Sequence, residues 1–171
     1  MDVPRLLYDR LEEMTALAPN VSVHAMKTLA REASRILLAT EGCESPIEQL
    51  LSIELERLYR IFDWRRGRDY VINQQHEVKC KCGTYRLDFL VCVTTRTVEA
   101  EVGVECDGHD YHDRTKEQAA RDKARDRDLQ LAGTPILRFT GSEIHKNPAR
   151  CAQEVFDFLD TQLAAKERML R

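Results

Sequence analysis

Three acidic residues stand where neighbouring β-strands would bring them together. Asp88 interrupts the otherwise hydrophobic run of residues 85–91, and a lone carboxylate there costs desolvation free energy unless a cation meets it. Glu105 and Asp107 are two residues apart on the next predicted strand, so both point to one face, roughly 7 Å apart at about 3.3 Å per residue. Antiparallel pairing of the two strands can bring Asp88 close to Glu105. Clustered carboxylates raise one another's pKa, and a hard divalent ion such as Mg²⁺ or Mn²⁺ resolves the repulsion with oxygen ligands.

Each acid taken alone has a simpler explanation. The glutamates of residues 99–105 alternate on one strand and could form a solvated edge face with Arg86 as their partner. Glu48 is explained as a helix cap, and His112 as a surface or capping histidine. The combination of acids on adjacent strands is what favours a metal site.

Residues 1–42 are predicted to form an N-terminal helical hairpin, a first domain that would either dimerise the protein or cover a sheet. Apolar residues recur at helical spacing in two stretches, and Ala18-Pro19-Asn20 breaks the first. The first stripe comprises Leu6, Leu7, Leu11, Met14 and Leu17, and the second comprises Met26, Leu29, Ala33, Ile36 and Leu37.

Residues 43–171 are predicted to form a second domain of the α/β class. Ser45-Pro46-Ile47-Glu48 begins a helix with a capping box. The hydrophobic period then changes from 3.6 to 2, which predicts an antiparallel meander of three strands near residues 70–81, 85–93 and 98–107. A charged helix over 115–132 leads to a short strand over 135–140, which a right-handed crossover makes parallel to the third. A last helix from 147 completes a mixed sheet flanked by helices.

This ordered set of residues resembles the PD-(D/E)XK nuclease superfamily, whose fold is restriction-endonuclease-like. The set consists of Glu48 on a helix, Asp88 on a strand, and Glu105-Cys106-Asp107 on the next strand. The closer resemblance is to the branch of very-short-patch-repair endonucleases and related endonuclease-like domains. That branch shares a D-G-x-x-H pattern, here residues 107–112, then a helix with an R-D pair, here Arg121-Asp122, and a strand like residues 136–139. The resemblance covers residues 45 to 150 and leaves out the first 40.

The resemblance implies roles for individual residues. Asp88 and Glu105 match the two metal-ligating acids of the superfamily, and Glu48 matches the helix acid that contacts the metal or its water. The superfamily lysine should stand two residues after Glu105, where this chain has Asp107 instead. An aspartate can ligate metal but cannot supply the missing positive charge.

Three residues are candidates to replace that lysine. A histidine near this point assists catalysis in the short-patch-repair branch, which makes His112 the natural substitute, and its ordinary pKa of about 6.5 suits a proton acceptor. Lys116 or Lys123 of the following helix could supply the positive charge. The implied chemistry is phosphodiester hydrolysis, in which a water made acidic by Mg²⁺ or Mn²⁺ attacks phosphorus in line.

A nucleic-acid partner, DNA in preference to RNA, requires local basic surface. The loop after the capped helix carries Arg65, Arg66 and Arg68, and the first hairpin carries Lys79, Lys81 and Arg86. The basic residues of the charged helix alternate with aspartates, which is typical of a salt-bridged solvated face.

Composition limits these hypotheses. The 26 Lys and Arg against 29 Asp and Glu give a formal charge of −3, which argues against binding nucleic acid by bulk charge alone. No apolar run reaches the roughly 18 residues that span a bilayer, and acids near the N-terminus do not fit a signal peptide, so we expect a cytoplasmic protein without membrane insertion.

Two alternatives remain open. The same fold, without the lysine, could be a non-catalytic module that binds nucleic acid or protein. A weaker alternative is a zinc-stabilised domain that uses His76, Cys80 and Cys82, for which no fourth ligand is apparent.

Overall fold

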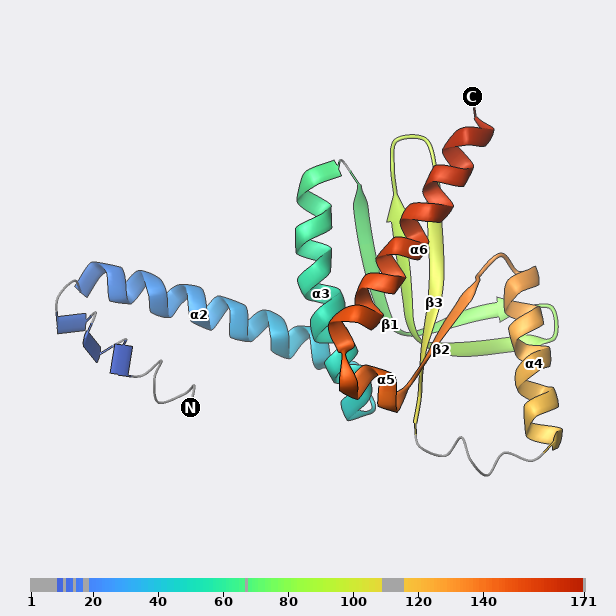
Figure 1. Ribbon diagram of the computed structural model, residues 1–171, viewed down its shortest axis with the longest axis horizontal. Coiled ribbons are helices and arrows are strands. Elements are labelled where there is room, and N and C mark those ends of the chain that lie inside the picture. The colour runs from blue at the N-terminus through green and yellow to red at the C-terminus, as the bar shows by residue number, and fades with distance from the viewer. Residues whose placement is uncertain are drawn as a thin grey trace. The chain divides into compact units, whose positions relative to one another are not determined.

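The computed structural model describes residues 9–10, 12–13, 15–16, 19–66, 68–108 and 116–170 (Figure 1). The chain divides into two compact units, Met1–Leu38 and Ala39–Arg171. In the first unit, the short described stretches before residue 17 are helical, and α2 (Pro19–Thr40) begins at the proline of the predicted break. The apolar residues of the first predicted stripe, 6, 7, 11, 14 and 17, lie outside the described residues. The helical hairpin therefore stays a prediction.

The second unit is built around a mixed four-stranded sheet in the order β1-β2-β3-β4. The chain runs through α3 (Pro46–Arg66), β1 (Asp69–Cys80), β2 (Gly83–Thr94), β3 (Glu99–Asp107), α4 (Lys116–Leu131), β4 (Ile136–Thr140), α5 (Gly141–Lys146) and α6 (Pro148–Met169). The first three strands form the antiparallel meander, and β4 pairs with β3 in parallel. The predicted fold class, a restriction-endonuclease-like mixed sheet flanked by helices, is confirmed.

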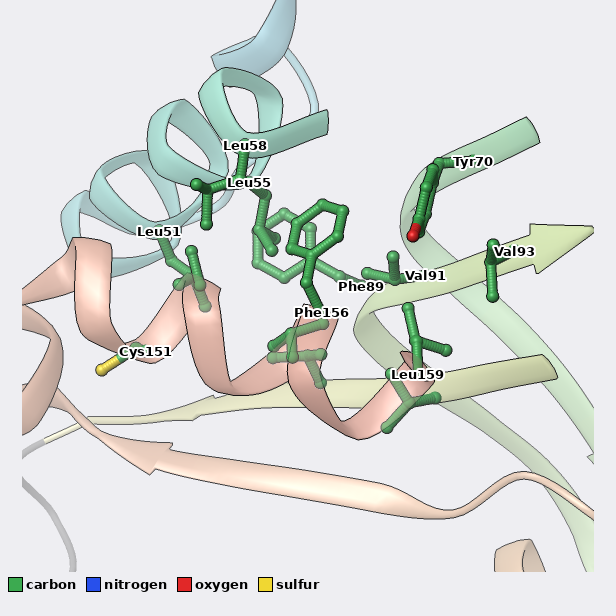
Figure 2. Packing of buried hydrophobic residues seen from close by; sticks show 14 of the residues in the cluster. Leu51, Leu55, Leu58, Tyr70, Phe89, Val91, Val93, Cys151, Phe156 and Leu159 are labelled. Atoms are coloured by element: carbon green, nitrogen blue, oxygen red, sulfur yellow. The ribbon is translucent and has the colours of Figure 1, made fainter. Parts of the chain in front are cut away.

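The main core lies between one face of the sheet and the helices α3 and α6. Figure 2 shows leucines of α3 and side chains of α6 directed toward the valines of β2. Phe89, Val91 and Val93 of β2 belong to this core, as does Phe156 of α6, whose ring lies 5.2 Å from that of Tyr70. A smaller core on the other face joins Leu87 and Leu90 to Leu129 of α4. The sheet is therefore covered on both faces, which explains why its central strands are largely apolar.

The sequence did not predict α5. Its six residues follow β4 without a loop, and Thr140 caps them: the Thr140 hydroxyl accepts from the backbone N–H of Glu143, whose carboxylate accepts from Thr140 in return. The helix is too short for a hydrophobic period to show, which is why its sequence signal is missing.

Candidate active site

Asp88 and Glu105 lie across from each other on neighbouring strands. Phe89 pairs with Val104 in the antiparallel register of β2 and β3, and continuing that register by one step places Asp88 opposite Glu105. A backbone contact fixes this approach, since the N–H of Cys106 donates to Asp88 Oδ2 over 2.7 Å. The juxtaposition expected from the strand patterns is present. We call Glu48, Asp88, Glu105 and Asp107 the acid cluster.

Asp88 carries a destabilised negative charge. Burial raises the pKa of its carboxyl, and the charges of Glu48 and Asp107 raise it further, while the hydrogen bond from Cys106 and the charge of Arg125 lower it. Among the described residues Asp88 forms no ion pair. Its charge is therefore the one in the cluster with the most to gain from an added cation.

Glu105 is the most enclosed acid of the two strands, with 6% of its surface exposed. Arg125 of α4 grips both carboxylate oxygens, one of them over 3.1 Å, and Nη1 of Arg138 on β4 lies 2.9 Å from Oε2. Burial raises the pKa of Glu105, as do Asp88 and Asp107, and the two arginines oppose the shift. Two guanidinium groups thus contact the Glu105 carboxylate, which the sequence predicted to be a metal ligand.

Glu48 caps α3, as its position predicted. The Ser45 hydroxyl donates to Glu48 Oε1 over 2.6 Å, and the backbone N–H of Glu44 donates to Oε2 over 2.9 Å. The same Oε2 accepts a hydrogen bond of 2.9 Å from the side-chain amide of Gln75 on β1. Glu48 is 6% exposed, so the cap also brings a buried carboxylate to the cluster, where its charge acts on Asp88.

Arg138 contacts two acids of the cluster, Glu105 and Asp107, and one aspartate of α4. Its Nη1 lies 3.4 Å from Asp107 Oδ1, in addition to its contact with Glu105, and its Nη2 donates to Asp126 of α4 over 2.7 Å. Asp107 is thus drawn toward the arginine rather than presented alone in the position of the superfamily lysine.

The helix α4 faces the cluster with side chains that the sequence assigned to a solvated surface. Arg125 donates to the backbone oxygen of Arg86 over 2.7 Å and lies 5.7 Å from the centroid of the Tyr85 ring. The Tyr85 hydroxyl in turn donates to Asp128 over 3.0 Å. The expectation of a salt-bridged solvated face is therefore wrong for Arg125, Asp126 and Asp128, because their partners lie on the sheet and not one turn away on the helix.

The candidates for the missing lysine are placed differently. His112 lies outside the described residues, and Lys116 is the first residue of α4. Lys123 is exposed. Arg125 and Arg138, by contrast, contact the acid cluster directly.

The predicted phosphate-binding residues are scattered. Arg65 and Arg66 belong to the last turn of α3, and Lys79 and Lys81 are exposed at the end of the β1–β2 hairpin. Two arginines already have acidic partners: Arg86 lies 2.7 Å from Glu44 with both side chains largely exposed, and Arg68 pairs with Asp160 of α6. Arg68 therefore joins α6 to the start of β1.

No group of three or more His, Cys, Asp or Glu side chains in the described part of the chain converges as a ready-made metal site. This holds for the acid cluster and equally for His76, Cys80 and Cys82, of which Cys82 is exposed in the hairpin turn. The donor chemistry of the cluster nevertheless fits a hard ion, because all four of its groups are carboxylates. Beside them, Oε1 of Gln75, the hydrogen-bond partner of Glu48, is buried without a hydrogen-bond donor among the described residues.

Sequence reasoning missed Gln75, Arg125 and Arg138 as members of the site. The signal for Arg138 was present, since an arginine in the middle of the short apolar strand of residues 136–140 needs an acidic partner. Arg125 is one of several basic residues on its helix, and nothing in the helical pattern distinguishes it.

A family model, REase_MTES_1575, which describes a restriction-endonuclease-like family, matches residues 60–159. The match includes all four strands, α4 and α5, and therefore Asp88, Glu105 and Arg125, while Glu48 lies before it. Comparison with curated proteins finds no match, and neither does comparison with solved structures. No helix within the described residues has the length and apolar character to cross a membrane.

Proposed function

The chain belongs to REase_MTES_1575, a restriction-endonuclease-like family, and on this basis we propose that it is a metal-dependent nuclease that hydrolyses phosphodiester bonds of DNA. The observation that carries the proposal is the pair Asp88 and Glu105, opposed on β2 and β3. Burial and neighbouring carboxylates raise the pKa of both: Glu48 and Asp107 act on Asp88, and Asp88 and Asp107 act on Glu105. Such a pair is stabilised by a cation. A kinship with the very-short-patch-repair branch of the superfamily remains a proposal.

We assign metal binding to Asp88 and Glu105, with Glu48 as a third contact, and Mg²⁺ or Mn²⁺ as the ion. Bound there, the ion would supply a more acidic water and positive charge for the phosphoryl oxygens. Asp88 can bind the ion without first breaking an ion pair, because it has none among the described residues. Glu105 has to release one of its guanidinium contacts to take part.

The positive charge that the superfamily lysine supplies comes, in this proposal, from Arg125. The Arg125 guanidinium contacts Glu105, the Arg86 backbone oxygen and the Tyr85 ring. It would therefore stay beside the acids if Glu105 gave up its contact with Arg125 to bind the ion. His112 remains the candidate proton acceptor, and the exposed lysines 79 and 81 remain candidates for contacts to DNA phosphates.

Cleavage of supercoiled plasmid in the presence of Mg²⁺ or Mn²⁺ tests the proposal. We expect Asp88→Asn and Glu105→Gln to lower the cleavage rate by at least about a hundredfold, since each removes a ligand charge without changing side-chain size. Glu99→Gln, on the same strand but exposed, is the matched control and should cleave like the wild type. Undiminished cleavage by both site variants would show that the acids are misassigned.

A non-catalytic binding module is the second candidate, and one observation favours it. The two arginines on Glu105 can take the place of a metal ion permanently, as a purely structural solution to a buried carboxylate. In that case the wild-type protein retards DNA in a gel, binds no Mn²⁺ in a calorimeter and leaves the DNA intact.

A further inference from the structure

Gln75 has a backbone conformation that its residue type rarely adopts. Its φ of 48° is the one positive φ of a non-glycine residue within the described parts of the chain. The left-handed region is disfavoured for a side chain such as glutamine, and residues held there cluster at functional sites. Gln75 also lies in the middle of β1, where both neighbours are paired with β2: Gln74 with Phe89, and His76 with Leu87.

The unusual backbone turns two consecutive side chains to the same side of the strand. Successive residues of a strand normally point to opposite faces. Here the Gln74 amide donates to Ser52 of α3 over 3.1 Å, and the Gln75 amide donates to Glu48 of α3 over 2.9 Å. The left-handed residue therefore brings Gln75 to the face that carries Glu48.

The partner strand changes its alternation at the same place. Leu87 and Leu90 of β2 are three residues apart, yet both belong to the smaller core on the α4 side. The position between the paired residues 74 and 76 of β1 corresponds, in the register, to Asp88. The positive φ of Gln75 and the change of alternation at Asp88 thus occur at one cross-strand position, beside the acid cluster.

The orientation of the Gln75 amide is determined by its partner. Glu48 Oε2 is an acceptor, so the atom that faces it at 2.9 Å has to be the nitrogen. The other atom, Oε1, is then a buried carbonyl oxygen with no donor among the described residues. A buried acceptor without a partner is costly and rare, which indicates that a group not belonging to the described chain satisfies it.

We propose that Gln75 Oε1 is a neutral ligand of the divalent ion that we assign to Asp88, Glu105 and Glu48, and that the left-handed backbone at Gln75 directs the amide oxygen toward this ion. Amide oxygens of Gln are among the ligands of hard divalent cations. The inference rests on the proposed function, because it assumes a metal site at the acid cluster. It adds an uncharged oxygen donor to the carboxylates of the acid cluster.

Titration of MnCl₂ into the metal-free protein of residues 1–171, followed by calorimetry, tests the inference with Gln75→Asn. Asparagine keeps the amide but is one methylene shorter, and it tolerates the left-handed region better than glutamine. We expect Mn²⁺ to bind about tenfold or more weakly to this variant, with an unchanged or higher melting temperature in the absence of metal. Gln130→Asn, at an exposed position of α4, is the control and should bind like the wild type.

The outcomes separate this inference from the proposed function. Wild-type affinity in Gln75→Asn overturns the role of Gln75 and leaves the metal-dependent nuclease intact. Absence of Mn²⁺ binding to the wild type overturns the metal-dependent function and this ligand together.

A second variant protects the test against a folding defect in the first. In Gln75→Glu a carboxylate replaces the amide beside Glu48, so the repulsion is relieved only when a cation binds. Mn²⁺ should therefore raise the melting temperature of Gln75→Glu more than that of the wild type. An equal or smaller rise contradicts the ligand role.

Discussion

At the scale of single residues, the behaviour of Asp88 follows from its surroundings. Its carboxylate is half-buried, receives one backbone hydrogen bond of 2.7 Å, and lies near the negative charges of Glu48 and Asp107. The folded protein therefore binds a proton at Asp88 more readily than the unfolded chain does, and the pKa of this carboxyl is raised. The ionised form is a source of instability that a bound cation would remove.

This predicts the pH dependence of stability. A carboxyl whose pKa is raised in the folded state makes its full contribution to the free energy of unfolding at pH values below its ordinary pKa of about 3.9. That contribution is lost as the pH rises through the raised pKa of the folded state. Asp88→Asn removes that loss, because an amide oxygen can still accept from Cys106 but carries no charge. In metal-free buffer we expect the variant to melt a few degrees above the wild type at pH 7, with the difference shrinking toward pH 4.

Thermal unfolding monitored by circular dichroism measures this difference. Adding Mn²⁺ should reverse the order at pH 7, since only the wild type gains from the ion. An Asp88→Asn variant that is less stable than the wild type at pH 7 without metal would mean that the Asp88 charge is already satisfied.

The residues of the site differ in how far their sequence context reveals them. Asp88 stands out because a carboxylate in an apolar strand is expensive, and Glu48 because Ser45 precedes it by the spacing of a cap. Gln75 has no such signal. A positive φ is normally announced by glycine, asparagine or aspartate, and a glutamine in a half-polar strand is ordinary.

At the scale of elements, α4 is the part of the fold that completes the site. Arg125 reaches from this helix to Glu105, whose side chain is 8% exposed, while the Arg125 side chain is 25% exposed. Breaking a buried ion pair by removing one partner leaves an uncompensated charge, although Arg138 still contacts Glu105 here. The attachment of α4 therefore depends on the pairing of these charges.

A double-mutant cycle on Arg125→Met and Glu105→Gln measures that dependence. We expect Arg125→Met alone to lower the free energy of unfolding by about 2–3 kcal/mol, and the two changes together to cost less than their sum by roughly 1–2 kcal/mol. Arg121→Met, at an exposed position one turn earlier on α4, should stay within about 0.5 kcal/mol of the wild type. Urea denaturation at pH 7 gives the free energy of unfolding of all five proteins, and strict additivity of Arg125→Met and Glu105→Gln would contradict the pairing.

The order and type of the elements could be predicted from the sequence, whereas their contacts could not. Alternation along β2 and β3 and the helix before β4 were sufficient for the meander and the parallel strand. The sequence does not predict which side of α4 faces the sheet, because charged residues repeat along the helix without a clear apolar stripe. Only the tertiary structure shows that Arg125, Asp126 and Asp128 have partners on the sheet.

At the scale of the whole molecule, the formal charge of −3 is no argument against a nucleic-acid partner. Part of the acidic excess is gathered in the acid cluster between β1, β2, β3 and α3, where Glu48 and Glu105 are buried and Asp88 is half-buried. The divalent ion that we propose would offset this charge. Lys79 and Lys81, at the tip of the β1–β2 hairpin, are exposed and do not belong to the acid cluster. Every described member of the site belongs to the unit of residues 39–171.

The most direct test of the central claim is the anomalous scattering of a crystal of the protein of residues 1–171 soaked in Mn²⁺. The account predicts a peak about 2.0–2.3 Å from an oxygen of Asp88, with Gln75 Oε1 and a carboxylate of Glu48 or Glu105 completing the protein ligands. A crystal soaked at saturating Mn²⁺ that shows no anomalous peak at Asp88, and in which Arg125 and Arg138 still contact Glu105, would contradict the account. It would favour the non-catalytic binding module.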